Sequence, residues 1–416
     1  MASPTTPSTS GAPPASPTTS RKPPSSEESR SPKTKDTTSG PASHSAEDLK
    51  PPRVPKFPTH NAPRVWLITS ASSPIGISLS RHLLSHGDYI VAGISPSDLT
   101  TNAEPSTSPF RSFLTEISSH VKDNWKARFK PIPLDIRILG QCQSAIADAV
   151  SSFGRIDVLF CCTSFSVVGA VEELAATPLA RTLVRDQFET NFFGTVNVVK
   201  AVLPTFRAKR NGHIVVLTGI TGHLGTPGLG IYCASQWALE GYCDSLAYEV
   251  APFNIRTTIV QPNVEVGVLT NRIVGAPPLA AYQGESNTAP LFRDILSGLL
   301  DRLEGGEARG REGTETTEGD GEDRGPTTGD LLHQQKISTV YAGLGKGLKE
   351  RLVAETVYAV AAIGGHDNPP SRHIVGHEGV ASVKEKLKTV SEELEDFVEV
   401  SAAVDIRDEG MGVLSA

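Results

Sequence analysis

The apolar residues of this chain gather in short runs, separated by segments whose apolar positions repeat at helical spacing. The first run, "RVWLIT" (64–69), precedes a segment with Ile75, Leu79 and Leu83 that ends at Gly87, a typical helix C-terminus. The later runs are "YIVAGIS", "FKPIPLDI", "IDVLFCC", "GHIVVLT" and "IRTTIVQP". Near-continuous apolar strands that alternate with helices predict an α/β fold, a doubly wound parallel sheet covered on both faces.

The turn after the first predicted strand is a candidate ligand site, because doubly wound sheets bind ligands beyond the carboxyl ends of their strands. It reads "TSASSPIG", from Thr69 to Gly76. A dinucleotide-binding turn uses glycines to let the backbone approach the pyrophosphate, and a last glycine to pack helix against strand. Only Gly76 is present in such a role. The turn by itself therefore predicts a fold element rather than a cofactor site.

Composition divides the chain into one folded domain and three irregular segments. Residues 1–61 are rich in Pro, Ser and Thr, and residues 304–335 are rich in Gly and Glu. Neither segment has enough apolar residues to offset the entropy of ordering. We expect a disordered tail at 1–61, a single domain at 62–400 with a disordered acidic insertion at 304–335, and a C-terminal tail at 401–416.

Charge and cysteine content exclude several classes of protein. A net charge of -7 and a pI near 5.9 argue against nucleic acid or an anionic membrane as the main partner. No run approaches the roughly 20 apolar residues that span a bilayer, so we expect no integral membrane segment. The five cysteines are an odd number without C-x-x-C spacing, which argues against a disulfide framework or a zinc site. We expect a cytoplasmic protein without a metal.

Three later segments carry a resemblance to a known family. They are "FETNFFGTVNVVKAVLP" (188–204), the stretch 212–256 that contains "YCASQ", and "NPPSRHIVG" (368–376). Together they resemble the short-chain dehydrogenase/reductase family, especially its hydroxysteroid- and retinol-dehydrogenase-like branch. The resemblance covers roughly Pro63 to Leu387, apart from the acidic insertion. It implies a Rossmann-like fold, a homodimer and NAD(P)-dependent oxidoreductase activity.

Four residues of this chain align with the family's catalytic positions, and two of the four are the residue types that the family has there. Tyr232 matches the tyrosine that exchanges a proton with the substrate, and Asn191 matches the asparagine that supports a relay water. A structural hydrogen bond explains Asn191 equally well. Gln236 stands where the family has a lysine, and Gly219 where it has a substrate-orienting serine. Thr218 is one place off on the strand end and should face the other way.

The cofactor positions also depart from the family pattern. Ser70 and Pro74 replace two glycines, and Pro74 has no N–H to offer a phosphate. Ser95 is neither the acid that favours NAD nor the base that favours NADP; family habit implies NADP, with NAD left open. Asp135 matches a residue near the adenine, or caps the following helix. The residues at cofactor positions are Thr69, Ile75, Gly76, Asp135, Cys161 and Val264.

Two functional hypotheses follow. The first is an NAD(P)-dependent oxidoreductase for a small but bulky lipophilic ketone or alcohol, with Tyr232 as proton donor or acceptor. A tyrosine without a cationic neighbour keeps a pKa near 10, so only about one part in a thousand is ionised at neutral pH. Alcohol oxidation needs that ionised form, whereas ketone reduction uses the neutral tyrosine and should survive at a reduced rate. The alternative is a non-catalytic protein that keeps the fold for binding or regulation.

Overall fold

The computed structural model describes one body of the chain, and every described residue lies within the unit Lys50–Ala416. The described residues are 62–100, 108–262, 266–277, 279–282, 338–341 and 346–402. The expected tail 1–61 and the expected insertion 304–335 lie outside them. So does the expected C-terminal tail beyond Ala402, where helix α15 (Val398–Ala402) ends.

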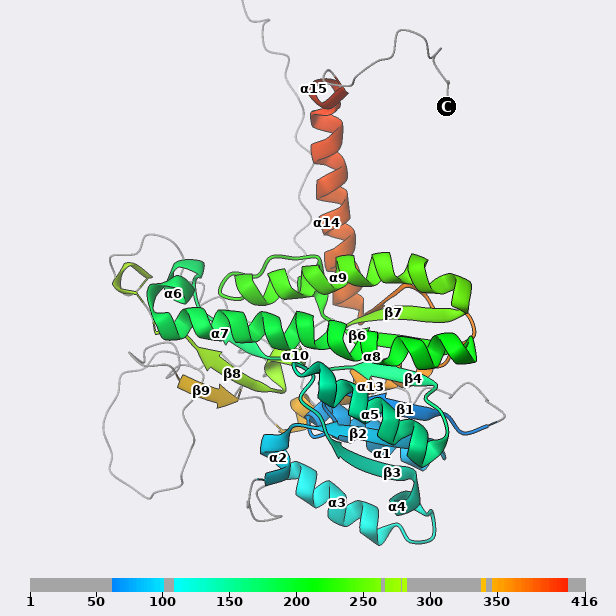
Figure 1. Ribbon diagram of the computed structural model, residues 1–416. Coiled ribbons are helices and arrows are strands. Elements are labelled where there is room, and N and C mark those ends of the chain that lie inside the picture. The colour runs from blue at the N-terminus through cyan, green and yellow to red at the C-terminus, as the bar shows by residue number, and fades with distance from the viewer. Residues whose placement is uncertain are drawn as a thin grey trace, which may run out of the picture. The chain divides into compact units, whose positions relative to one another are not determined.

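A seven-stranded sheet forms the centre of the fold (Figure 1). Its strands are β1 (Val65–Ile68), β2 (Tyr89–Ile94), β3 (Phe129–Pro133), β4 (Val158–Cys161), β6 (Gly212–Leu217), β7 (Ile255–Pro262) and β10 (Arg372–Val375). The order is β10-β7-β6-β4-β1-β2-β3, and all neighbouring strands are parallel. The predicted doubly wound Rossmann-like sheet is therefore confirmed. Its strand order reverses between β1 and β4, where such sheets bind ligands.

Helices cover both faces of the sheet because successive strand residues point to opposite sides. In β1, Trp66 and Ile68 belong to one apolar cluster, and Val65 and Leu67 to the other. The first cluster contains α1 (Pro74–Ser85), α3 (Pro109–Ser119) and α13 (Lys346–Ile363). The second contains α5 (Leu139–Phe153), α8 (Gly194–Lys209) and α9 (Gly230–Val250).

A three-stranded second sheet was not predicted from the sequence. It joins β5 (Ser166–Val168), β8 (Arg272–Gly275) and β9 (Ser338–Tyr341), with β5 parallel and β9 antiparallel to β8. The other elements are α2 (Pro96–Thr100), α4 (Trp125–Arg128), α6 (Val171–Ala176), α7 (Pro178–Phe188), the π-helix η2 (Glu189–Phe193), the 3₁₀-helices η3 (Ile220–Gly222), η4 (Ala251–Phe253) and η5 (Ala280–Tyr282), α10 (Val266–Leu269) and α14 (His377–Asp396).

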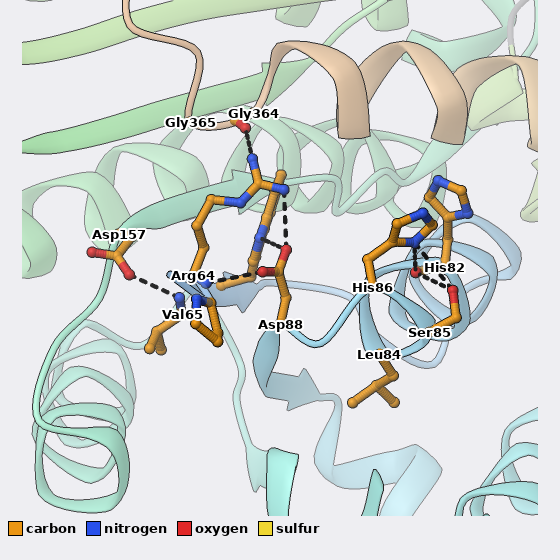
Figure 2. Close-up of polar contacts among 12 residues, drawn as sticks. Arg64, Val65, His82, Leu84, Ser85, His86, Asp88, Asp157, Gly364 and Gly365 are labelled. Carbon is orange, nitrogen blue, oxygen red and sulfur yellow. Dashed lines mark hydrogen bonds and ion pairs between the residues drawn. The ribbon is translucent and has the colours of Figure 1, made fainter. Parts of the chain in front are cut away.

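A buried polar cluster, here called the Arg64 clamp, closes the amino-terminal edge of the sheet (Figure 2). Asp88 accepts from the Arg64 backbone at 2.9 Å, from the Arg64 guanidinium at 3.1 Å and from Trp66 Nε1 at 3.1 Å. The guanidinium also donates to the carbonyl of Gly364, just beyond α13. The clamp thus ties the first strand to a segment 300 residues later in the chain.

Candidate active site

A small pocket lies where β4 and β6 end, beside helices α9 and α10. Its volume of about 10 Å³ is the space of roughly one water molecule. The lining residues are Cys161, Cys162, Thr163, Ser164, Thr195, Leu217, Thr218, Tyr232, Gln236, Leu239 and Gly267. Three of the predicted site residues, Tyr232, Gln236 and Cys161, are brought together here.

Tyr232 projects from the first turn of α9 and is 1% exposed. Its hydroxyl oxygen lies 3.5 Å from Ser164 Oγ, and a Cβ added to Gly267 would lie 3.1 Å from it. The backbone of α10 therefore lies directly over the hydroxyl. The pocket beside Tyr232 has room for about one water molecule, so a substrate carbonyl needs more space than it now offers.

Gln236 lies one turn beyond Tyr232 on the same face of α9, as its spacing predicts. The side chain is buried, and its Nε2 is 3.4 Å from Ser235 Oγ. The amide can donate a hydrogen bond to a sugar hydroxyl, but it carries no charge. It cannot stabilise a tyrosinate as an ammonium group would.

Asn191 lies outside the pocket lining and holds the chain that follows Ser164. Its Oδ1 accepts from the backbone N–H of Phe165 at 2.8 Å, and its Nδ2 donates to the Phe165 carbonyl at 2.9 Å and to Ser235 Oγ at 3.2 Å. It sits in the π-helix η2, an irregularity that is frequent at functional sites. These contacts support the structural interpretation, and its catalytic role stays a prediction.

Gly219 also lies outside the pocket lining, in extended backbone before η3. The neighbouring Thr218 lines the pocket, but its hydroxyl donates to Glu240 Oε1 at 2.9 Å. Glu240 is a buried carboxylate that also accepts from Gln261 Nε2 at 2.8 Å and from Arg372 Nε at 2.9 Å. Thr218 is thus committed to this network rather than to Tyr232.

Ser164 is the hydroxyl next to Tyr232, and sequence reasoning missed it. It follows β4 in the segment "CCTS", at the point where strand order reverses. Its position after a strand of the switch point is the one signal that could have identified it. Serine is so common in loops that the residue type alone carries no such information.

The turn between β1 and α1 is held mainly by its own contacts. Thr69 Oγ1 accepts from the Cys162 N–H at 3.1 Å and from the Thr163 hydroxyl at 2.9 Å, which joins the ends of β1 and β4. The Gly76 N–H donates to the capping Ser73 Oγ, and a Cβ on Gly76 would lie 2.2 Å from the Ser70 carbonyl. Since Pro74 has no N–H, the first amide N–H of α1 is that of Ile75, and its role in binding a phosphate stays a prediction.

The remaining predicted cofactor residues differ in their surroundings. The Asp135 carboxylate pairs with Arg137 at 2.7 Å, which lowers its pKa, and it does not cap the next helix: Ile138 holds the N-cap position of α5. Burial raises the pKa of the Cys161 thiol well above its usual value and that of Cys162 to about 12. Both cysteines are therefore poor nucleophiles. Val264 lies outside the described residues.

A carboxylate that the sequence analysis did not single out lies beside the turn. Asp98, on the short helix α2 that follows β2, accepts a hydrogen bond from the Ser72 hydroxyl at 2.6 Å. It lies close to the end of β2, where Rossmann-like folds place the adenosine ribose.

The comparisons with known proteins agree with this fold. Residues 64–271, half of the chain, match the family of short chain dehydrogenases, so the chain belongs to that family. An oxidoreductase named BOA17 from Botryotinia fuckeliana is 31% identical over 48% of this chain and 65% of its own length. Human retinol dehydrogenase 8 is 35% identical over 38% of this chain and 47% of its own length. The chain thus covers about half to two thirds of these relatives.

A solved structure shows the same fold over most of the chain. A short-chain dehydrogenase from Streptomyces avermitilis superimposes with a TM-score of 0.56 at 23% identity, over 83% of this chain and all of its own. In the described part of the chain, no helix combines the length and the apolar character of a membrane span. Those residues also contain no cluster of three or more His, Cys, Asp or Glu side chains placed to hold a metal.

Proposed function

We propose that this protein is an NAD(P)-dependent oxidoreductase that reduces a bulky lipophilic ketone slowly, with Tyr232 as the proton donor. The observation that carries the proposal is the placement of Tyr232, Gln236 and Ser164 around one pocket at the carboxyl edge of the sheet. That edge is where this family's fold binds its cofactor.

The residues around Tyr232 suit reduction better than oxidation. The bound cofactor would supply a hydride to the carbonyl carbon. Tyr232 donates its proton to the carbonyl oxygen and becomes a tyrosinate. The Ser164 hydroxyl, at 3.5 Å, can donate a hydrogen bond to that tyrosinate, but Gln236 adds no positive charge. The tyrosinate is therefore less stabilised than it would be beside a lysine, which slows the reaction without abolishing it.

A nicotinamide fits this site only after α10 shifts, because the pocket now has room for about one water. Once α10 moves, Gln236 would meet the nicotinamide ribose and the Ile75 amide would meet the pyrophosphate. Gly267 permits the close packing of α10 on this site, since a Cβ there would lie 3.1 Å from the Tyr232 hydroxyl and 3.2 Å from Ser164 Oγ.

The wall beside Tyr232 supports a lipophilic substrate. Tyr232 packs in one apolar cluster with Val168 of β5, Leu229, Val268 of α10 and Ile273 of β8. Val168 and Ile273 lie on the second sheet, Val268 lies on α10, and Leu229 is the N-cap of α9; all four are buried. A substrate that enters beneath α10 would exchange water for these apolar groups.

The form of the cofactor depends on Asp98. The family habit implies NADP, but a 2′-phosphate on the adenosine ribose would approach the Asp98 carboxylate, which Ser72 holds in place. The negative charges of the 2′-phosphate and the Asp98 carboxylate would repel each other, whereas a ribose hydroxyl can donate a hydrogen bond to a carboxylate. We therefore expect NADH to bind more tightly than NADPH.

Calorimetric titration with NADH and NADPH, followed by turnover assays on steroid and aromatic ketones, tests the proposal. Tyr232→Phe should lower turnover by about 10²–10⁴-fold, and Ser164→Ala by a smaller factor. Tyr248→Phe is the matched control, since Tyr248 is an exposed tyrosine of the same helix. Binding of neither cofactor, or wild-type turnover that survives Tyr232→Phe, would overturn the assignment.

A further inference from the structure

Ser166, the first residue of β5, is buried with its hydroxyl unsatisfied. The residue is 1% exposed, and its Oγ has no hydrogen-bond partner in the described part of the chain. Burying a hydroxyl without a partner costs free energy, so each such group in a folded protein calls for an explanation. A ligand is one source of the missing partner, and the surroundings of Ser166 favour it.

The side chain of Ser166 points to the face of the second sheet on which Tyr232 packs. Val167 packs on one face of this sheet, in an apolar cluster with side chains of α7 (α7 and β8 are labelled in Figure 1). Val168 packs on the opposite face, in the same apolar cluster as Tyr232. Since alternate residues of a strand share a face, Ser166 lies with Val168 on the Tyr232 face.

The neighbouring strand gives the same direction for the Ser166 side chain. Strand β5 runs parallel to β8, and Ser166 stands opposite Ile273. Residues that stand opposite each other in paired strands point to the same face of the sheet. Ile273 also packs in the Tyr232 cluster. The Ser166 hydroxyl is therefore a polar group set among the apolar side chains of that cluster.

Asn191 fixes Ser166 relative to Ser164, the serine whose hydroxyl faces Tyr232. The Asn191 side chain forms hydrogen bonds with both the N–H and the carbonyl of Phe165, the residue between the two serines. Two residues of chain span at most about 7 Å. The two serine hydroxyls thus lie on one short, anchored segment, at a separation close to that of two oxygens on opposite carbons of a ring.

We propose that Ser166 is a specificity-determining residue whose hydroxyl binds a second oxygen of the substrate while Tyr232 meets the carbonyl that is reduced. This inference rests on the proposed function. A serine hydroxyl can donate to a carbonyl and can either donate to or accept from a hydroxyl. The second group should be neutral, because the apolar neighbours Val168 and Ile273 cannot compensate a charge. The substrate class is therefore a lipophilic hydroxyketone or diketone, rather than a plain ketone or a keto acid.

Such a site discriminates through the hydroxyl that it leaves unpaired. When the site opens to admit a plain ketone, Ser166 is covered again without a partner. A ketone with a second oxygen pairs with Ser166 instead, and sites built to bind a substrate hydroxyl discriminate against analogues that lack it. One neutral hydrogen bond corresponds to a preference of about 3–10-fold.

Calorimetric titration with a matched pair of ketones tests the inference. The pair is α-tetralone and α-tetralone with a hydroxyl on the ring carbon opposite the carbonyl. The titrations contain the oxidised cofactor, which cannot reduce a ketone, so they report affinity without turnover. The hydroxylated ketone should bind about 3–10-fold more tightly, and Ser166→Ala should remove this preference. Ser80→Ala is the matched control, because Ser80 of α1 is also buried and its hydroxyl also has no partner among the described residues.

The stability of the Ser166→Ala variant separates a ligand partner from a structural one. Its free energy of unfolding should equal or exceed that of the wild type, since the folded chain loses no hydrogen bond. A clear decrease would show that the hydroxyl is already paired in the fold, for example with a buried water, and would overturn the proposal. Equal affinities of the two ketones for the wild type, a preference that survives Ser166→Ala, or failure of both ketones to bind would also overturn it.

Turnover assays with the reduced cofactor and the same two ketones distinguish this inference from the proposed function. Absence of turnover, with the Ser166-dependent preference intact, would contradict the proposed reduction by Tyr232 and still support the Ser166 contact. Turnover of both ketones at equal affinity would support the reduction and refute the Ser166 contact.

Discussion

Two clusters at opposite ends of the central sheet, the Arg64 clamp and the residues beside Tyr232, differ in the length and the charge of their hydrogen bonds. At the amino-terminal edge, the Asp88 carboxylate accepts three hydrogen bonds and the Arg64 side chain bridges β1 to the segment after α13. At the carboxyl edge, Tyr232 faces Ser164 at 3.5 Å, and Gln236 donates to Ser235 Oγ at 3.4 Å. The first set has short contacts of full strength, and the second has long, weak ones.

This difference separates what preserves the fold from what performs chemistry. At the amino-terminal edge, the buried Arg64–Asp88 ion pair and the hydrogen bond from Arg64 to the Gly364 carbonyl hold segments together that lie far apart in the sequence. Ser164 and Gln236 beside Tyr232 are neutral, and their hydrogen bonds are long. The chain thus keeps the family's framework although several residues of its catalytic and cofactor motifs have changed.

Among the changes predicted for the two ends of the sheet, removal of the Asp88 carboxylate should have the largest effect, a loss of free energy of unfolding. Asp88→Ala leaves the buried Arg64 guanidinium without its carboxylate and the Trp66 indole N–H without its acceptor. We expect a loss of about 3–5 kcal/mol in the free energy of unfolding, measured by chemical denaturation. Asp123→Ala, which removes an exposed ion pair with His120, should cost at most about 1 kcal/mol. Similar losses in the two variants would show that the Arg64 clamp contributes little.

The amino-terminal edge should also make stability depend on pH through His213. The Gly365 N–H donates to His213 Nδ1 at 2.9 Å, so Nε2 carries the hydrogen and donates to Thr258 Oγ1 at 2.9 Å. Burial lowers the pKa of His213 to about 3 in the folded state. The unfolded chain binds the proton near pH 6.5, so stability is full above that pH and decreases as the pH falls toward 3.

Between about pH 6 and pH 4 this histidine should cost roughly 1.4 kcal/mol per pH unit. His213→Gln keeps a donor and an acceptor but cannot titrate, so its unfolding free energy should depend less steeply on pH. His120→Gln, at an exposed histidine, serves as control. Equal slopes for wild type and His213→Gln would contradict the buried neutral histidine.

The sequence predicted more of the framework than of the site, for a physical reason. The six apolar runs coincide with six strands of the sheet, because a strand buried on both faces is apolar throughout; the edge strand β3 is apolar only in part and is buried only at Phe129 and Ile132. The second sheet was missed because its strands are only three or four residues long and β9 lies far along the chain from β8. Tyr232 and Gln236 were identified through resemblance, whereas Ser164 and Asp98 depend on tertiary contacts that no local pattern shows.

The carboxyl edge differs from the amino-terminal edge because no positive charge lies one helical turn from Tyr232. Restoring such a charge should reduce this difference and raise turnover. Gln236→Lys would place an ammonium group one turn from Tyr232, where it can lower the pKa of the tyrosine. Combined with Gly219→Ser, it should raise turnover by about 10-fold or more, with alcohol oxidation gaining more than ketone reduction because oxidation starts from tyrosinate. Steady-state assays in both directions measure this, and Tyr232→Phe should abolish the gain. An unchanged rate despite cofactor binding would show that the charge is not what limits the reaction.

The smallest expected effect is on the relative affinity for NADPH and NADH, and it comes from Asp98 near the carboxyl edge of the sheet. Asp98→Asn keeps an acceptor for the Ser72 hydroxyl but removes the negative charge that would face a 2′-phosphate. NADPH affinity should rise by about 3- to 10-fold relative to NADH, and the gain should shrink at high salt because Asp98 is exposed.

Asp123→Asn, which changes an exposed carboxylate on a different loop, controls for the change in net charge. Paired calorimetric titrations give the ratio directly. If Asp98→Asn alters both affinities by one factor, Asp98 shapes the turn rather than selecting the cofactor, because only a charge beside the ribose distinguishes the two dinucleotides.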